Sequence, residues 1–268
     1  MRSILKKISK KMNSICNPEK QIGTSRIRTK LNHKILVGTH HKIGTVWMGS
    51  IFKKISQNLG LVFYSGKQKS LPENFDIFFE HHSYFDFNQL QMDHKGLHLV
   101  RDPRDTIISG CFYHQKAKEK QLHIKKDKFG GLTYQEKINS YDSLDDKLLF
   151  EMEYAARGTI VDMLKWDYSN SAFMEVKYEE LVTDINLLLF HKIFTNLEFS
   201  GEHIPEVLRI AYDNSLFSGN LKKLPHVRSG RPSQWKNYFK PIHKKRFIEL
   251  FGDALIKLGY ENNNDWAN

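Results

Sequence analysis

The sequence predicts one α/β domain with a central parallel sheet flanked by helices. Short apolar runs that suit buried strands alternate along the chain with longer segments of helical periodicity. When strands alternate with helices, the strands pair in parallel and the crossover helices cover the faces of the sheet. The length of 268 residues suits one large domain, and no linker divides it.

The first strand and the first helix have the clearest patterns. Residues 34–38, Lys-Ile-Leu-Val-Gly, form a short apolar run typical of a buried strand. Apolar residues then recur mostly every three to four positions over 45–59, which predicts a helix, and Gly60 is placed to end it. The other predicted strands are 61–64, 76–79, 96–100 and 173–176.

Helical patterns dominate the later part of the chain. A helix is predicted to begin near Pro103, because proline suits the first helical turn. Residues 116–128 are dense in charge, and we expect a mobile loop or an exposed helix end there. Residues 144–166 are expected to form one long helix or two short ones, and 241–258 form an amphipathic tail that Gly259 caps.

Residues 1–32 are predicted to be a basic extension, and residues 33–268 the folded domain. Apolar residues at helical spacing between lysines fit a helix packed on the domain, a membrane-surface helix or a frayed tail. The extension lacks the continuous apolar core of a signal peptide, and no run is long enough to span a bilayer. We therefore expect a cytoplasmic protein without a transmembrane segment.

The composition indicates an anionic partner and a reducing compartment. Lysine and arginine outnumber aspartate and glutamate by 41 to 30, for a formal net charge of +11. This balance favours a nucleic acid, an acidic membrane surface or a phosphorylated small molecule, although a solvated basic surface also explains it. The two cysteines, Cys16 and Cys111, match no metal-ligand spacing and fit a protein without disulfides.

The turn over 38–47 joins the first strand to the first helix and has features of a phosphate-binding site. Backbone N–H groups at a helix start are unpaired, and the helix dipole favours anions there. Gly44 lets the backbone approach a ligand, Lys42 supplies a positive charge and Thr45 a hydroxyl. A Walker A loop needs lysine directly after its second glycine, whereas Thr45 follows Gly44 here. A structural turn without a ligand remains the alternative.

The pattern Lys-x-Gly-Thr-x-Trp over 42–47 is similar to the 5′-phosphosulfate loop of sulfotransferases that use 3′-phosphoadenosine 5′-phosphosulfate (PAPS). Residues 99–109, with Arg-Asp-Pro-Arg-Asp and a later serine, resemble the 3′-phosphate motif of that family. Arg101 can grip a phosphate through two parallel hydrogen bonds. The alternative for this motif is a set of surface ion pairs among Arg101, Asp102, Arg104 and Asp105.

Three further stretches follow in the order of the family: 176–181, 228–236 and 247–260. The resemblance thus covers residues 34 to 260. It implies a sulfotransferase domain whose fold is like that of P-loop nucleoside triphosphate hydrolases. It also implies transfer of a sulfuryl group from PAPS to a hydroxyl or amine of a small-molecule acceptor, with 3′-phosphoadenosine 5′-phosphate (PAP) as product and without a metal.

The resemblance assigns residues to the donor. Those at the 5′-phosphosulfate are Lys42, Ile43, Gly44, Thr45 and Val46. Those at the 3′-phosphate are Arg101, Ser109, Arg228 and Gly230, with Ser229 in the same loop. Those near the adenine or beside the nucleotide are Trp47, Tyr178 and Phe217.

The resemblance also implies the catalytic groups. Lys42 is expected to stabilise the charge that builds on the leaving phosphate. His82, just past the strand at 76–79, is the expected base, because an imidazole with a pKa of about 6.5 suits proton removal near neutral pH. His81 is the second candidate. Glu80 stands where many members of the family have lysine. Three roles are open for it: it raises the basicity of a nearby histidine, it faces the acceptor, or it is itself the base.

The acceptor is expected to be a small molecule, and natural-product tailoring on a guanidinium alkaloid is one class that fits the chain. Two other functions remain open. A P-loop nucleotide kinase would need a Walker lysine with a neighbouring magnesium-binding hydroxyl, and the sequence lacks that pair. A non-enzymatic nucleic-acid-binding protein would fit the net charge of +11, but the basic residues are dispersed and match no nucleic-acid-binding motif.

Overall fold

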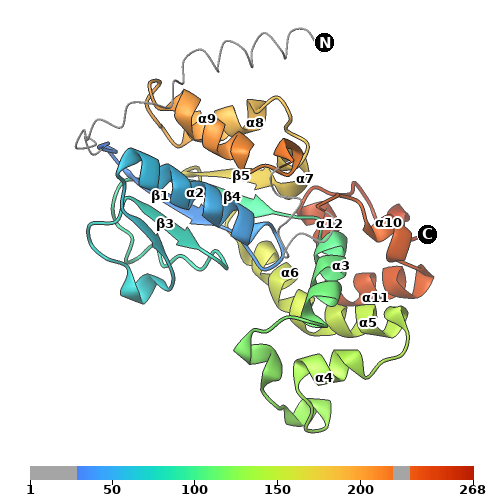
Figure 1. Ribbon diagram of the computed structural model, residues 1–268. Coiled ribbons are helices and arrows are strands. Elements are labelled where there is room, and N and C mark those ends of the chain that lie inside the picture. The colour runs from blue at the N-terminus through green and yellow to red at the C-terminus, as the bar shows by residue number, and fades with distance from the viewer. Residues whose placement is uncertain (1–28, 220–229) are drawn as a thin grey trace.

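The computed structural model describes residues 29–219 and 230–268. Five parallel strands form one sheet in the order β2-β3-β1-β4-β5 (Figure 1). The predicted parallel α/β architecture is therefore confirmed. The strands are β1 (Lys34–Gly38), β2 (Phe63–Ser65), β3 (Ile77–Glu80), β4 (His94–Val100) and β5 (Phe173–Lys177).

Helices cover one face of the sheet and group together beyond its end. α8 and α9 lie above the sheet in Figure 1, with α2 beside α9. α3, α4, α5 and α11 form a helical group to the right of the sheet, and α6 lies below it. The longer helices are α2 (Thr45–Leu59), α3 (Pro103–His114), α5 (Leu144–Glu153), α6 (Ala155–Lys165), α8 (Leu188–Asn196), α9 (Ile204–Asp213) and α11 (Pro241–Phe251). The short ones are α4 (Tyr134–Asn139), α7 (Tyr178–Leu181), α10 (Trp235–Tyr238) and α12 (Ala254–Lys257).

Two apolar clusters form the core, one on each face of the sheet. The larger cluster joins β1, β3 and β4 to the helices. The smaller one packs Leu36 and Phe78 against aromatic residues of the loop after β3 and against Trp166. Phe85 of that loop contacts Phe78 with ring centroids 5.6 Å apart. Loop aromatics thus take part of the covering role that we expected helices to fill.

Several boundaries differ from the prediction for local reasons. The strand predicted at 61–64 begins at Phe63, because the amide of Leu61 donates to Ser56 at the helix end and that of Val62 donates to the Asp76 carboxylate. The 144–166 segment is two helices, separated at Tyr154 by a non-helical φ of −115°. The start of β2 and the division at Tyr154 depend on contacts that the spacing of apolar residues in the sequence does not indicate.

The C-terminal tail and the charged loop also differ. Gly252, with φ 53°, divides the tail into α11 and α12, while Gly259 has the positive φ of 69° that its capping role predicted. The charged segment 116–128 contains the short 3₁₀ turns η2 (Lys120–His123) and η3 (Asp127–Phe129). Within residues 29–219 and 230–268, no helix has the length and apolar character to cross a membrane.

Candidate functional site

The order of the strands creates a topological switch point at the carboxyl ends of β1 and β4. From β1 the chain passes through α2 to β2 on one side, and from β4 it passes through α3 to β5 on the other. Ligands of open α/β sheets bind at such a switch point, where neighbouring connections diverge. The turn after β1 and the start of α3, which carry the two motifs, lie at this point.

The turn from Thr39 to Gly44 has two residues with left-handed backbone. Lys42 has φ 65° and Gly44 φ 91°. A Cβ added at Gly44 would lie 3.1 Å from the Tyr178 ring, so both the angle and the space favour glycine. Thr45 donates to the carbonyl of His40 at 2.8 Å and so stabilises the turn. No described side chain caps the start of α2, which leaves its N–H groups to an anion.

Arg101 follows β4 and is directed at the turn. It is 5% exposed, and its Nη1 donates to the carbonyl of Lys42 at 2.8 Å. Its guanidinium lies 4.4 Å from the centre of the Tyr178 ring. Its Nε has no hydrogen-bond partner among the described residues, and Asp105 is 3.9 Å away. A buried guanidinium with an unused donor is suited to an anionic ligand.

Lys42 supplies a second positive charge at the same place. Its Nζ lies 3.4 Å from the centre of the Tyr113 ring. Burial and the nearby charge of Arg101 lower the pKa of Lys42 to about 8. Two neighbouring buried cations create a site that a phosphate would stabilise.

The charged residues at the start of α3 are buried, so the alternative of surface ion pairs is wrong. Asp102 caps the helix and pairs with Arg104 at 2.8 Å. Arg104 also pairs with Glu261 at 2.6 Å and lies 3.7 Å from the centre of the Trp235 ring. Asp105 accepts the backbone N–H of Trp235 at 2.9 Å. These contacts hold α3 against the C-terminal segment and leave Arg101 to the site.

Solved structures of known proteins resemble this chain in fold. No protein-family model and no curated protein matches the sequence. A mouse sulfotransferase, SULT7A1, complexed with PAP superposes with a TM-score of 0.55 and 17% identity, over 85% of each chain. A retinol dehydratase in a complex with retinol and PAP gives 0.51 and 15%, over 83% of this chain and 81% of the other. The chain has the sulfotransferase fold.

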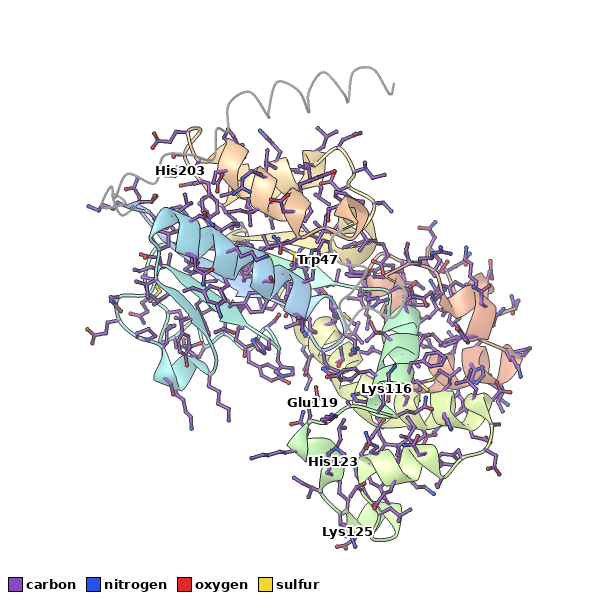
Figure 2. The ribbon with its side chains drawn as sticks, in the orientation of Figure 1. Trp47, Lys116, Glu119, His123, Lys125 and His203 are labelled. Atoms are coloured by element: carbon purple, nitrogen blue, oxygen red, sulfur yellow. The ribbon has the colours of Figure 1, made fainter. Side chains whose placement is uncertain are left out.

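Trp47 and Tyr178, two of the aromatic residues assigned to the nucleotide, pack near the turn. Trp47 of α2 makes edge contacts with Tyr178 and Phe190, with ring centroids 6.1 and 6.0 Å apart. Its buried Nε1 has no partner in the part of the chain that the structure describes. Figure 2 shows Trp47 beside the α2 ribbon. Ile43 is fully buried, whereas Val46 is 66% exposed.

The other residues assigned to the donor are more dispersed. Ser109 is half-buried on α3. Phe217 lies in the 3₁₀ turn η4 (Leu216–Ser218), where its ring contacts Tyr212 of α9 at a centroid distance of 6.0 Å. Gly230 has φ 65°. Arg228 and Ser229 lie outside the described residues.

The two candidate bases of the sulfotransferase fold follow β3 and point to different partners. His82 is exposed, and its ring stacks on Tyr84 with centroids 5.6 Å apart. His81 Nε2 lies 2.7 Å from the hydroxyl of Ser65 on β2, and burial lowers its pKa. The buried Glu80 accepts the backbone N–H groups of His82 and Tyr84 at 2.7 and 2.8 Å. Its carboxylate therefore shapes this loop.

Sequence reasoning missed two hydrogen-bonded chains that end in the turn. One runs from Glu175 through His98 to His40, and the other from Glu151 through His114 to His41. Only the adjacent pair His40-His41 was visible as a signal, because its partners lie 58 to 135 residues further along the chain. No cluster able to hold a metal ion occurs in the two described stretches.

Proposed function

We propose that this protein is a sulfotransferase that moves a sulfuryl group from PAPS to a hydroxyl or amine of a small-molecule acceptor. One observation carries the proposal: Lys42 and Arg101 converge on the uncapped start of α2 at the switch point of the sheet. Two of the solved structures with the same fold are complexes with PAP.

The donor would lie along the turn with its two phosphate ends held separately. Lys42 and the amides from Ile43 to Val46 would hold the 5′-phosphosulfate, since Gly44 lets the ligand approach the backbone. Arg101 and Ser109 would bind the 3′-phosphate together with the loop at Arg228, Ser229 and Gly230. The aromatic residues for the nucleoside would be Trp47, Tyr178 and Phe217.

In the reaction, an acceptor oxygen or nitrogen attacks sulfur as the bond to the 5′-phosphate breaks. Lys42 would stabilise the charge that develops on the leaving phosphate. A histidine would remove the acceptor's proton. The resemblance assigns this role to His82, with His81 second, and its exposed position beyond β3 supports access to an acceptor.

A cationic acceptor, such as a guanidinium natural product, would pair with the Glu119 carboxylate in the otherwise lysine-rich loop after α3. Glu119 accepts the hydroxyl of Tyr113, and its other oxygen is buried without a partner within the described chain. Figure 2 places Glu119 in this loop, close to Lys116. The same proposal includes a sulfotransferase domain over 33–268 behind a basic extension of 1–32, action in the cytoplasm, and no metal.

Calorimetric titration with PAP, beside ATP and AMP, tests the donor site. We expect micromolar or tighter binding that needs the 3′-phosphate. Arg101→Ala should weaken it by about 30-fold or more, because truncating a buried charge partner costs about 2 kcal/mol or more. Arg209→Ala is the control, since Arg209 is an exposed arginine of α9 paired with Glu206 and Asp213. Equal binding of ATP would favour a nucleotide kinase. Salt-sensitive binding of nucleic acid, without binding of PAP, would favour a non-enzymatic nucleic-acid-binding protein.

A further inference from the structure

A buried carboxylate is connected to His41 of the turn through one intermediate imidazole. Glu151 of α5 is 1% exposed, and its Oε2 lies 2.8 Å from Nδ1 of His114 on α3. Nε2 of His114 lies 3.0 Å from Nε2 of His41, and the two rings stack with an interplanar angle of 10°. Three separate elements thus supply one continuous chain of hydrogen bonds.

The packing of α3 on α5 is shaped around this chain. A Cβ at Gly110 would lie 2.2 Å from the carboxylate of Glu151, so only glycine admits the carboxylate at that position. The hydroxyl of Tyr134 donates to the same Oε2 at 2.7 Å. Burial raises the pKa of Tyr134, which therefore remains a proton donor. The carboxylate is held in place by two donors.

The chain determines which nitrogen of His41 carries a proton. A carboxylate only accepts, so Nδ1 of His114 carries a hydrogen and donates it to Glu151. In the neutral tautomer of His114 that this bond selects, Nε2 has a lone pair, which accepts from Nε2–H of His41. Nδ1 of His41 is left as a proton acceptor. A carboxylate that orients an imidazole in this way also stabilises the imidazolium that forms when the ring takes a proton.

We propose that His41 is the proton acceptor of the sulfuryl transfer, and that His114 and Glu151 are its positioning residues. The inference rests on the proposed function. As the acceptor oxygen or nitrogen bonds to sulfur, its proton passes to Nδ1 of His41. The electron pair of the breaking sulfur–oxygen bond passes to the 5′-phosphate of PAP, beside Lys42. Release of that proton to solvent restores the ring.

His41 has the supports that His82 lacks in the described structure. His82 is exposed and its ring stacks on a tyrosine. Among the described residues, no carboxylate is hydrogen-bonded to the nitrogens of that ring. Burial and the neighbouring His114, Lys42 and His82 lower the pKa of His41 to about 3. The negative charges of the donor oppose each of these causes and raise the proton affinity of the ring. The titratable groups around it are Lys42, His82, Tyr113, His114, Glu119, Tyr134 and Glu151.

Nitrogen-15 NMR of labelled histidines tests the tautomer without an acceptor. The spectrum of the full-length protein with PAP should show His41 protonated at Nε2 and unprotonated at Nδ1. His41→Gln identifies the signal. A hydrogen on Nδ1 of His41 in the neutral ring would overturn the proposal.

Turnover of PAPS tests the catalytic role, with 2-naphthol, tyramine, agmatine and water as acceptors. His41→Gln should lower kcat by about 100-fold or more, because positioned general bases contribute about 10²- to 10⁴-fold. Glu151→Gln should lower kcat about tenfold or more and move the acidic limb of the pH profile to lower pH, since the imidazolium loses its stabilising charge. If Glu151 had only a structural role, the acidic limb of the pH profile would stay at the same pH in Glu151→Gln.

Glu175→Gln serves as the matched control. It alters the other series of hydrogen bonds, which ends at His40, a ring only 1% exposed and therefore out of reach of an acceptor. This variant should leave kcat within threefold.

The outcomes separate this inference from the proposed function. Loss of PAP binding in the wild type would overturn both. PAP binding without turnover of any probe would overturn transfer, and this inference with it. Normal turnover by His41→Gln together with loss in His82→Gln would overturn the inference alone and assign the base to His82.

Discussion

Lys42 combines a lowered proton affinity with a role that needs positive charge. Burial and Arg101 lower its pKa to about 8, and a bound anion should raise it again. Protons are then taken up on binding at pH values above about 8, so donor affinity should fall as the pH rises from 7 to 9.5.

Calorimetry with PAP at pH 7 and 9.5 measures this dependence. Lys42→Met should bind more weakly at pH 7 and lose most of the pH dependence. An unchanged slope in Lys42→Met would assign the titration to another group. The same variant should unfold at a higher temperature than the wild type in the absence of ligand, because it removes a cation that burial and Arg101 disfavour.

Gly44 offers a second test at the residue scale. Gly44→Ala should destabilise the protein by about 1–3 kcal/mol, because a left-handed backbone is strained for alanine and the new Cβ meets the Tyr178 ring. PAP affinity should fall with it. Denaturant unfolding measures the change, with Gly158→Ala as control. Gly158 lies inside α6 with open space around it, so that variant should be neutral or stabilising by up to about 1 kcal/mol.

At the scale of elements, the start of α3 depends on a buried ion pair. Asp102→Ala removes the helix cap and one partner of Arg104, which is 2% exposed. The loss should be about 3 kcal/mol in urea unfolding, since Glu261 is then the one carboxylate that still pairs with the guanidinium among the described residues. Asp213→Ala in the exposed pair with Arg209 should cost less than about 1 kcal/mol. Equal effects would mean that burial of the α3 pair has no energetic consequence.

Elements with local signals were predictable, and those fixed by tertiary contacts were not. β1 and α2 have the predicted bounds, because an apolar run and Gly60 define them within a few residues. The break at Tyr154 and the burial of Glu151 depend on packing between α3 and α5. Glu151 is a charged residue for which the sequence gives no signal of burial, and it lies in the core beside His114.

The candidate site shows the same division. The motifs found Lys42, Gly44 and Arg101, because each lies next to a strand end that the sequence marks. The relation of His41 to its carboxylate was invisible, since 110 residues separate the two in the chain. The roles of His82 and of the donor-binding residues remain predictions.

For the whole molecule, donor binding should stabilise the fold by mass action. A ligand at 100 times its Kd adds about 2.7 kcal/mol to the free energy of unfolding. For a domain of this size, the melting temperature should rise by about 5 °C or more. Thermal unfolding with PAP should show this shift in the wild type and in Arg209→Ala. A shift of the same size in Arg101→Ala would place the nucleotide elsewhere.

The hydrogen bond from Arg101 to the Lys42 carbonyl has a consequence for the rate of encounter. This bond joins the turn to the start of α3 before any ligand arrives, so the conformational entropy of the turn is lost during folding and not at each binding event. Association should therefore follow a single kinetic phase whose rate rises linearly with nucleotide concentration. The backbones of the free and PAP-bound turn should superpose within about 1 Å.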